Sequence, residues 1–77
     1  MKVKVIVTLK DRVLDPQGKA IQQTLNGMSF SDVKQVRQGK YFGIEVNIEN
    51  EEEAKAKVEE MCKKLLANLV IEDYKIL

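Results

Sequence analysis

The chain has 77 residues, of which 44% are apolar and 32% charged, with 13 basic and 12 acidic side chains and a formal net charge of +1. This length predicts a single domain over residues 1–77, and a domain this small buries only about 60% of the surface of its unfolded chain, so association would stabilise it. The basic residues are balanced and scattered, which argues against a nucleic-acid-binding surface. The pattern indicates neither a targeting peptide nor a membrane-spanning segment, so we expect a cytoplasmic protein.

The chain contains one cysteine and no histidine. An internal disulfide is therefore excluded. The commonest general base and metal ligand is missing, and one thiol cannot build a zinc or iron–sulfur site, so we expect no metal site. Cys62 lies on the apolar stripe of a predicted helix. We interpret it as a small buried hydrophobic residue rather than a nucleophile.

Residues 2–10 alternate between apolar and polar side chains, which is the period of a half-buried strand. Val3, Val5 and Val7 define the apolar face. Ile6 is the exception on the polar face, and we interpret it as a sign that the outer face of the sheet contacts another chain.

A helix is predicted from Pro16 to Asn26. Asp15 is suited to be its N-cap, because its carboxylate can accept hydrogen bonds from the free amides of the first turn, and Pro16 is favoured at the first helical position. Gly18 is costly inside a helix, which predicts a close approach of another segment at that turn. Gly27 is expected to form a left-handed cap. The apolar face of this helix is expected to carry Ile21, Leu25 and Met28.

The next segment predicts a β-hairpin. Residues 32–38 form an imperfect strand pattern, because Val33 and Val36 fall on opposite faces. Gln38-Gly39 supplies a glycine for a tight turn, and residues 41–49 alternate cleanly as a third strand.

The second helix begins after Asn50, which forms a capping box with Glu53. Its other face carries Glu-Lys pairs four residues apart, typical of a solvated surface. Asn68 closes the helix, and residues 69–77 form a last strand that is apolar on both faces. The expected apolar stripe contains Ala54, Val58, Met61, Cys62, Leu65 and Leu66.

The predicted order β-α-β-β-α-β is the ferredoxin-like α+β pattern, in which two helices cover one face of an antiparallel sheet and leave the other face open. The open face and the two-sided last strand together suggest that the domain dimerises.

No group of residues predicts catalysis by the isolated chain, since no paired carboxylates, activated nucleophile or phosphate-binding glycine loop is present. The helix start at Asp15 could attract an anion, but Asp15 would itself occupy the free amides. Arg37 and Lys40 flank the expected hairpin turn, where cations can bind carboxylates of a partner or simply confer solubility. Tyr41 and Gly43 extend the same surface.

Three motifs carry a family resemblance: Val-x-Leu-Lys at 7–10, Leu-Asp-Pro-Gln-Gly at 14–18 and Val-Arg-x-Gly-Lys at 36–40. In this order and spacing, the chain resembles the PurS family, the small subunit of phosphoribosylformylglycinamidine (FGAM) synthase, over nearly its whole length. The motif positions, taken as family-motif or partner-contact candidates with no catalytic step assigned, are Asp15, Pro16, Gly18, Arg37, Gly39 and Lys40.

The resemblance implies a non-catalytic subunit of an ATP-dependent carbon–nitrogen ligase in de novo purine (IMP) biosynthesis. It implies that this subunit joins a large synthetase subunit to a glutaminase subunit, so that ammonia from glutamine converts FGAR to FGAM. It also implies a homodimer or a dimer of dimers, with ATP and Mg used by the complex and no cofactor bound by this chain.

One alternative stays open on the sequence: a regulatory domain of ferredoxin-like fold that binds a small molecule between subunits. An RNA-binding module is disfavoured because the central strands lack paired exposed aromatics. A metal chaperone is disfavoured because no Cys-x-x-Cys loop follows the first strand.

Overall fold

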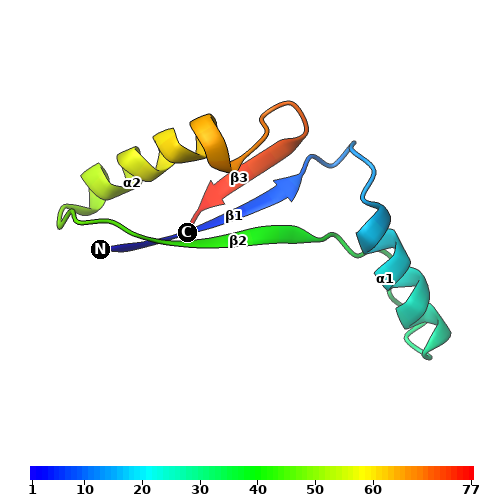
Figure 1. Ribbon diagram of the computed structural model, residues 1–77. Helices are drawn as coiled ribbons and strands as arrows, with labels where there is room; N and C mark the ends of the chain where they lie inside the picture. The colour runs from blue at the N-terminus through cyan, green and yellow to red at the C-terminus, as the bar shows by residue number, and fades with distance from the viewer.

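Three antiparallel strands form the sheet of this protein, for which the computed structural model describes residues 1–77. In chain order the elements are β1 (Lys2–Leu9), α1 (Pro16–Gly27), β2 (Gly39–Glu45), α2 (Glu51–Met61), the π-helical turn η1 (Cys62–Leu66) and β3 (Glu72–Ile76). The strand order is β2-β1-β3, with Val5 opposite Phe42 and Val7 opposite Tyr74 (Figure 1). The predicted α+β class and antiparallel sheet are confirmed. No helix has the length and apolar composition needed to cross a membrane.

The core lies between β1 and α2. Alternation along β1 points Val3, Val5 and Val7 to one face, where all three are buried, and the turns of α2 bring apolar side chains onto them. Cys62 is fully buried, as predicted. Ile6 lies on the opposite face and is 36% exposed. The buried apolar residues are Val3, Val5, Val7, Ala54, Val58, Cys62 and Ala67.

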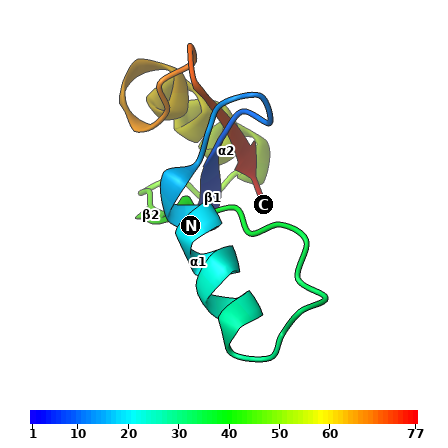
Figure 2. The same cartoon turned by 90° about the vertical axis from the view of Figure 1, so that its right-hand side faces the viewer.

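The arm, which we define as α1 with residues 28–38, projects beyond the end of the sheet (Figures 1 and 2). The molecule measures 48 × 24 × 13 Å and has a radius of gyration of 15.8 Å, whereas about 11 to 12 Å is usual for a compact domain of this length. The expected apolar residues Ile21 and Met28 are exposed because α1 lies on no sheet. The prediction that both helices cover one sheet face is therefore wrong for a single chain.

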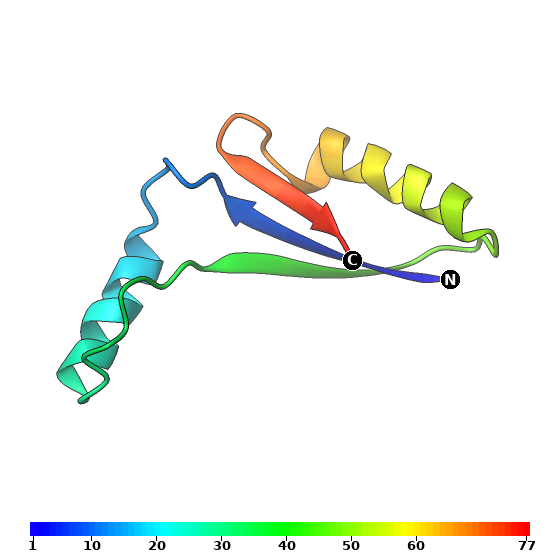
Figure 3. The ribbon, with the colours of Figure 1, turned by 180° about the vertical axis from the view of Figure 1, so that it is seen from behind.

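The expected strand over residues 32–38 is absent. Residue 32 lies in a turn, and residues 33–38 have no regular secondary structure and lie beside α1, where the Asn26 side chain donates a hydrogen bond to the Val33 carbonyl at 3.2 Å. The chain then continues through Gln38 into β2 without reversing (Figure 3). The predicted hairpin at Gln38-Gly39 is therefore wrong, and the chain supplies three strands rather than four.

Both outer strands are shorter than predicted. Glu45 of β2 lies opposite Lys2, and beyond this pair only Val46 bonds to Met1, the first residue. At the other end of the sheet, the amide of Glu72 still donates to the Asn68 carbonyl in a turn. β3 therefore begins only at Glu72.

The start of α1 is confirmed, and its end differs from the prediction. Asp15 caps the helix and Pro16 is its first residue. Gly27 lies inside the helix in a right-handed conformation, and the left-handed residue is Ser29, at φ 80°. The last turn runs past Gly27 because the Met28 amide still donates to helical carbonyls.

The helix over residues 51–66 contains a change of register. Its predicted cap is confirmed, because the Glu53 amide donates to Asn50 Oδ1 at 2.9 Å. From Cys62 the backbone hydrogen bonds span five residues instead of four, and the Ala67 amide donates to the Cys62 carbonyl at 3.0 Å. Within this π-helical turn the spacing departs from that of an α-helix, and Leu65, expected in the stripe, is 83% exposed. Three of the four expected ion pairs form, namely Glu51–Lys55, Glu59–Lys63 and Glu60–Lys64.

Candidate interaction site at the elbow

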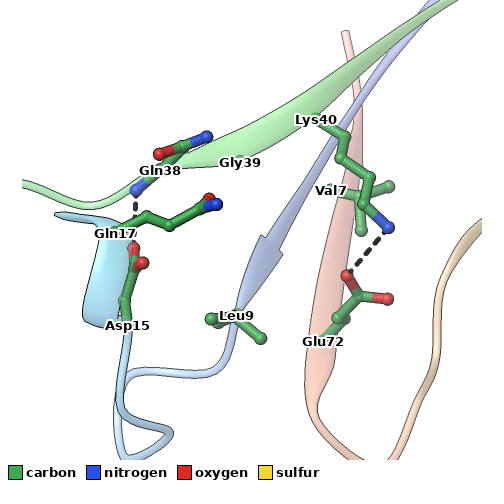
Figure 4. A pocket seen from close by; sticks show the side chains of 8 residues that line it. All are labelled: Val7, Leu9, Asp15, Gln17, Gln38, Gly39, Lys40 and Glu72. Carbon is green, nitrogen blue, oxygen red and sulfur yellow. Dashed lines mark hydrogen bonds and ion pairs between the residues drawn. The ribbon is translucent and has the colours of Figure 1, made fainter.

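Asp15 occupies the junction between the arm and the sheet, which we call the elbow (residues 9–18 and 36–40). One carboxylate oxygen, Oδ1, accepts from the Gly18 amide at 2.9 Å, and the other, Oδ2, accepts from the Gln38 amide at 2.7 Å (Figure 4). The residue is 6% exposed. A single carboxylate therefore joins the first turn of α1 to the residue that precedes β2.

The electrostatics keep this carboxylate ionised. The hydrogen bonds from the Gln38 and Gly18 amides lower the pKa of Asp15 below its ordinary value. Burial opposes this effect, and the nearby Arg37 guanidinium adds to it. Because the carboxylate already uses both oxygens within the chain, the helix start offers little to an external anion.

Gly18 is required by a close approach, as predicted. A Cβ added at this position would clash with the Val36 carbonyl oxygen and would lie 2.7 Å from Asp15 Oδ2. The missing side chain therefore lets the returning segment pass directly over the first turn of α1.

Arg37 binds backbone rather than solvent. Its Nη2 donates to the carbonyl oxygens of Lys10 at 3.0 Å and Val13 at 3.1 Å, with a longer contact to Leu9 at 3.4 Å. The expected hairpin tip does not exist, so Arg37 does not project from one. It holds the loop between β1 and α1 against the returning segment.

Gly39 and Lys40 begin β2 beside this junction. A Cβ at Gly39 would lie 2.6 Å from the Val7 carbonyl oxygen, so this glycine permits close strand packing rather than a turn. Lys40 Nζ lies 3.6 Å from Glu72 Oε2, and its side chain remains 62% exposed.

A pocket of about 220 Å³ opens between the elbow and β3 (Figure 4). Three of the six predicted motif residues line it, namely Asp15, Gly39 and Lys40. The remaining three, Pro16, Gly18 and Arg37, belong to the same junction but do not line the pocket. Its full lining is Val7, Leu9, Asp15, Gln17, Gln38, Gly39, Lys40 and Glu72.

Sequence reasoning missed several residues in and near the elbow. Gln38 contributes its backbone amide and Asn26 its side-chain amide, and neither bond leaves a sequence signal. Glu72 accepts a hydrogen bond from the Asn68 amide at 2.7 Å and forms an ion pair with Lys40. The strand expected over residues 69–77 contains Glu72, but nothing in the sequence marks Lys40, 32 residues earlier in the chain, as its partner.

The fold and this junction define a class of protein: a small α+β chain whose motif residues join a projecting arm to a three-stranded sheet. No group of three histidine, cysteine, aspartate or glutamate side chains is placed to hold a metal ion.

Comparisons with known proteins give the family. Residues 2–77 match the family model PurS, described as phosphoribosylformylglycinamidine (FGAM) synthase. The chain is 53% identical to the FGAM synthase subunit PurS of Methanocaldococcus jannaschii over 97% of this chain and 90% of that protein, and 53% identical to PurS of Bacillus subtilis over 96% and 87%. A chain in the structure of PurLQS from Thermotoga maritima has a TM-score of 0.90 at 36% identity, with coverage of 99% and 93%. The chain belongs to the PurS family of FGAM synthase subunits.

Proposed function

We propose that residues 1–77 act as one PurS-like domain, the small non-catalytic subunit that bridges the synthetase and glutaminase subunits of FGAM synthase. The observation that carries the proposal is the full-length likeness to a chain of the solved PurLQS structure. The elbow supports it, because the motif residues order an interaction element.

On this proposal the complex works in the cytoplasm on ATP, glutamine and FGAR, and the chain contributes alignment. Ammonia released into neutral water would be diluted and protonated. A subunit that holds the donor and acceptor sites together raises the effective concentration of ammonia without performing chemistry.

Lys40 is the motif residue best placed to contact a partner. Its ammonium group is largely exposed, and the carboxylate of Glu72 lies at 3.6 Å, which is too long for a strong hydrogen bond. We assign Lys40 to a carboxylate on a partner subunit. The other five motif positions, Asp15, Pro16, Gly18, Arg37 and Gly39, shape the elbow.

The arm is suited to pack against a second copy of this chain. The apolar face of α1 is exposed, while Phe42 and Ile44 of β2 are only half-buried on the sheet face that α2 covers. In a ferredoxin-like fold, the first helix lies over this half of the sheet. The exposed helix and the uncovered half of the sheet therefore complement each other, and one molecule cannot bring them together with its arm extended (Figures 1 and 3).

Exchange of arms would also complete the sheet. β2 is an edge strand, and residues 32–38, which are unpaired in the sheet, lead directly into it. Two copies related by a twofold axis near Gln38-Gly39 would place residues 32–38 of each copy along β2 of the other. This opened hairpin is the geometry of a domain-swapped homodimer, and it restores the fourth strand that the sequence predicts.

Analytical ultracentrifugation tests these assignments. The wild-type chain should sediment as a homodimer or a dimer of dimers, and should co-sediment with the large and glutaminase subunits of the same organism. Lys40→Gln should weaken co-sedimentation, whereas Lys57→Gln, an exposed lysine without an ion pair, should not.

Calorimetry against a panel of amino acids tests the alternative function, a regulatory domain that binds a small molecule. Micromolar binding of an amino acid by the isolated chain, without co-sedimentation, would favour the small-molecule regulator instead.

A further inference from the structure

The arm meets the sheet only through the elbow. Two chain crossings within the elbow connect them, residues 10–15 outward and residues 36–38 on return, and α1 packs extensively against neither the strands nor α2. The direction of the arm therefore depends on the bonds within these crossings (Figures 1 and 3).

Two side chains bind the crossings to each other. From the outgoing crossing, Asp15 accepts the amide of Gln38 at 2.7 Å. From the returning crossing, Arg37 donates to the carbonyls of Lys10 at 3.0 Å and Val13 at 3.1 Å. Gly18 leaves the space in which the Val36 carbonyl passes. We call Asp15, Gly18 and Arg37 the elbow clamp.

The clamp distinguishes the extended arm from a folded one. A hairpin at Gln38-Gly39 would reverse the chain there and lay residues 32–38 along β2 of the same molecule. The Gln38 amide would then point into the turn, and Arg37 would leave the carbonyls of the β1–α1 loop. The hydrogen bonds of the clamp are thus made only when the chain runs straight through residues 36–39.

We propose that the elbow clamp is a positioning device that holds the arm extended, so that a second copy rather than the same molecule receives it. This inference rests on the homodimer proposed above and adds the residues that select it. The clamp preorganises the arm, and preorganisation lowers the entropic cost of association. Asp15 and Arg37 act through the arm and touch no substrate.

The test compares clamp variants with matched controls from the same loop. Asp15→Asn and Arg37→Gln remove the clamp charges, while Asp11→Asn and Arg12→Gln make the same changes at exposed positions without hydrogen bonds. Sedimentation equilibrium of each full-length variant gives the dimer dissociation constant. We expect at least a tenfold increase for each clamp variant and less than a twofold change for each control.

Two further readouts separate positioning from general loss of stability. The double variant Asp15→Asn with Arg37→Gln should be less than additive, because either change alone releases the same elbow. Far-ultraviolet circular dichroism should remain that of the folded wild type, and Val58→Ala, which weakens the core away from the elbow, should not shift dimerisation to the same extent.

The outcomes keep the two proposals distinguishable. Clamp variants that dimerise as tightly as their controls overturn the clamp while leaving the bridging function intact. A wild-type chain that stays monomeric at micromolar concentration also overturns the clamp. A dimeric wild type that fails to join the large and glutaminase subunits overturns the bridging function alone.

Discussion

Gly18 and Gly27 provide a matched pair of glycine-to-alanine changes on one helix with opposite expected results. At Gly18 an added Cβ clashes with the Val36 carbonyl and approaches Asp15 Oδ2 at 2.7 Å. At Gly27 it meets nothing within 4 Å, and the backbone is right-handed. The substitution is therefore the same, and only the surroundings differ.

The magnitudes follow from two competing terms. Alanine in place of glycine stabilises a helix by about 0.5 to 1 kcal/mol, and overpacking costs about 1 to 3 kcal/mol. Gly27→Ala should raise the free energy of unfolding by about 0.5 kcal/mol, since it lies in the last turn. Gly18→Ala should lower it by about 1 to 2 kcal/mol, because the backbone carbonyl cannot move aside without opening the elbow.

Thermal and urea unfolding measure both variants at equal subunit concentration, because the stability of a dimer depends on concentration. For a domain of this size, about 1 kcal/mol corresponds to about 4 to 8 °C in Tm. Gly18→Ala should thus melt well below wild type and Gly27→Ala slightly above it. A Gly18→Ala protein as stable as Gly27→Ala would refute the close approach of Val36 to α1.

Three other expectations concern charge, packing and reactivity. Because the pKa of Asp15 is lowered in the folded protein, its ionised carboxylate stabilises the fold fully at pH above the ordinary pKa, and this stabilisation is lost as the pH falls through the lowered pKa. The urea midpoints of wild type and Asp15→Asn should therefore differ by a constant amount from pH 5 to 8 and converge in more acidic solution. A difference in midpoint that widens in acid contradicts the assignment. Val58→Ala should cost about 2 kcal/mol in urea unfolding because Val58 is fully buried. Leu65→Ala, within the π-helical turn and exposed, should cost less than about 0.5 kcal/mol. Equal costs would place Leu65 in the core. Burial and the nearby Glu59 raise the pKa of the Cys62 thiol. Iodoacetamide should therefore modify this thiol only when urea unfolds the chain, which mass spectrometry would show. Rapid labelling of the native protein would contradict the burial of Cys62.

The sequence correctly predicted the strand and the helix start that depend on neighbouring residues alone. Alternation from Lys2 to Leu9 gave the central strand, and the Asp15-Pro16 start gave α1. Gly18 was correctly linked to a close approach, because glycine inside a helix needs a reason.

The prediction of a hairpin at Gln38-Gly39 was wrong because the contacts that decide against it are not visible in the sequence. A glycine after an extended segment fits a turn as well as a tight strand crossing, and Gly39 serves the crossing against the Val7 carbonyl. Whether residues 32–38 fold back along β2 or lie beside α1 is decided by tertiary contacts. The Arg37 bonds that bear on this choice join residues 24 to 28 positions apart in the chain.

Leu65 shows the same limit on the second helix. A stripe with a period of 3.6 residues assigns it to the core, but the π-turn at Cys62 changes the register within the helix. No composition signal marks that turn in advance.

FGAM synthesis by the large and glutaminase subunits, measured with and without this chain, tests the central claim most directly. Glutamine and an ammonium salt serve in turn as the nitrogen source. A bridging subunit predicts that glutamine-driven synthesis depends on the chain, while ammonium-driven synthesis proceeds without it. If the chain changes neither reaction, the bridging role is wrong.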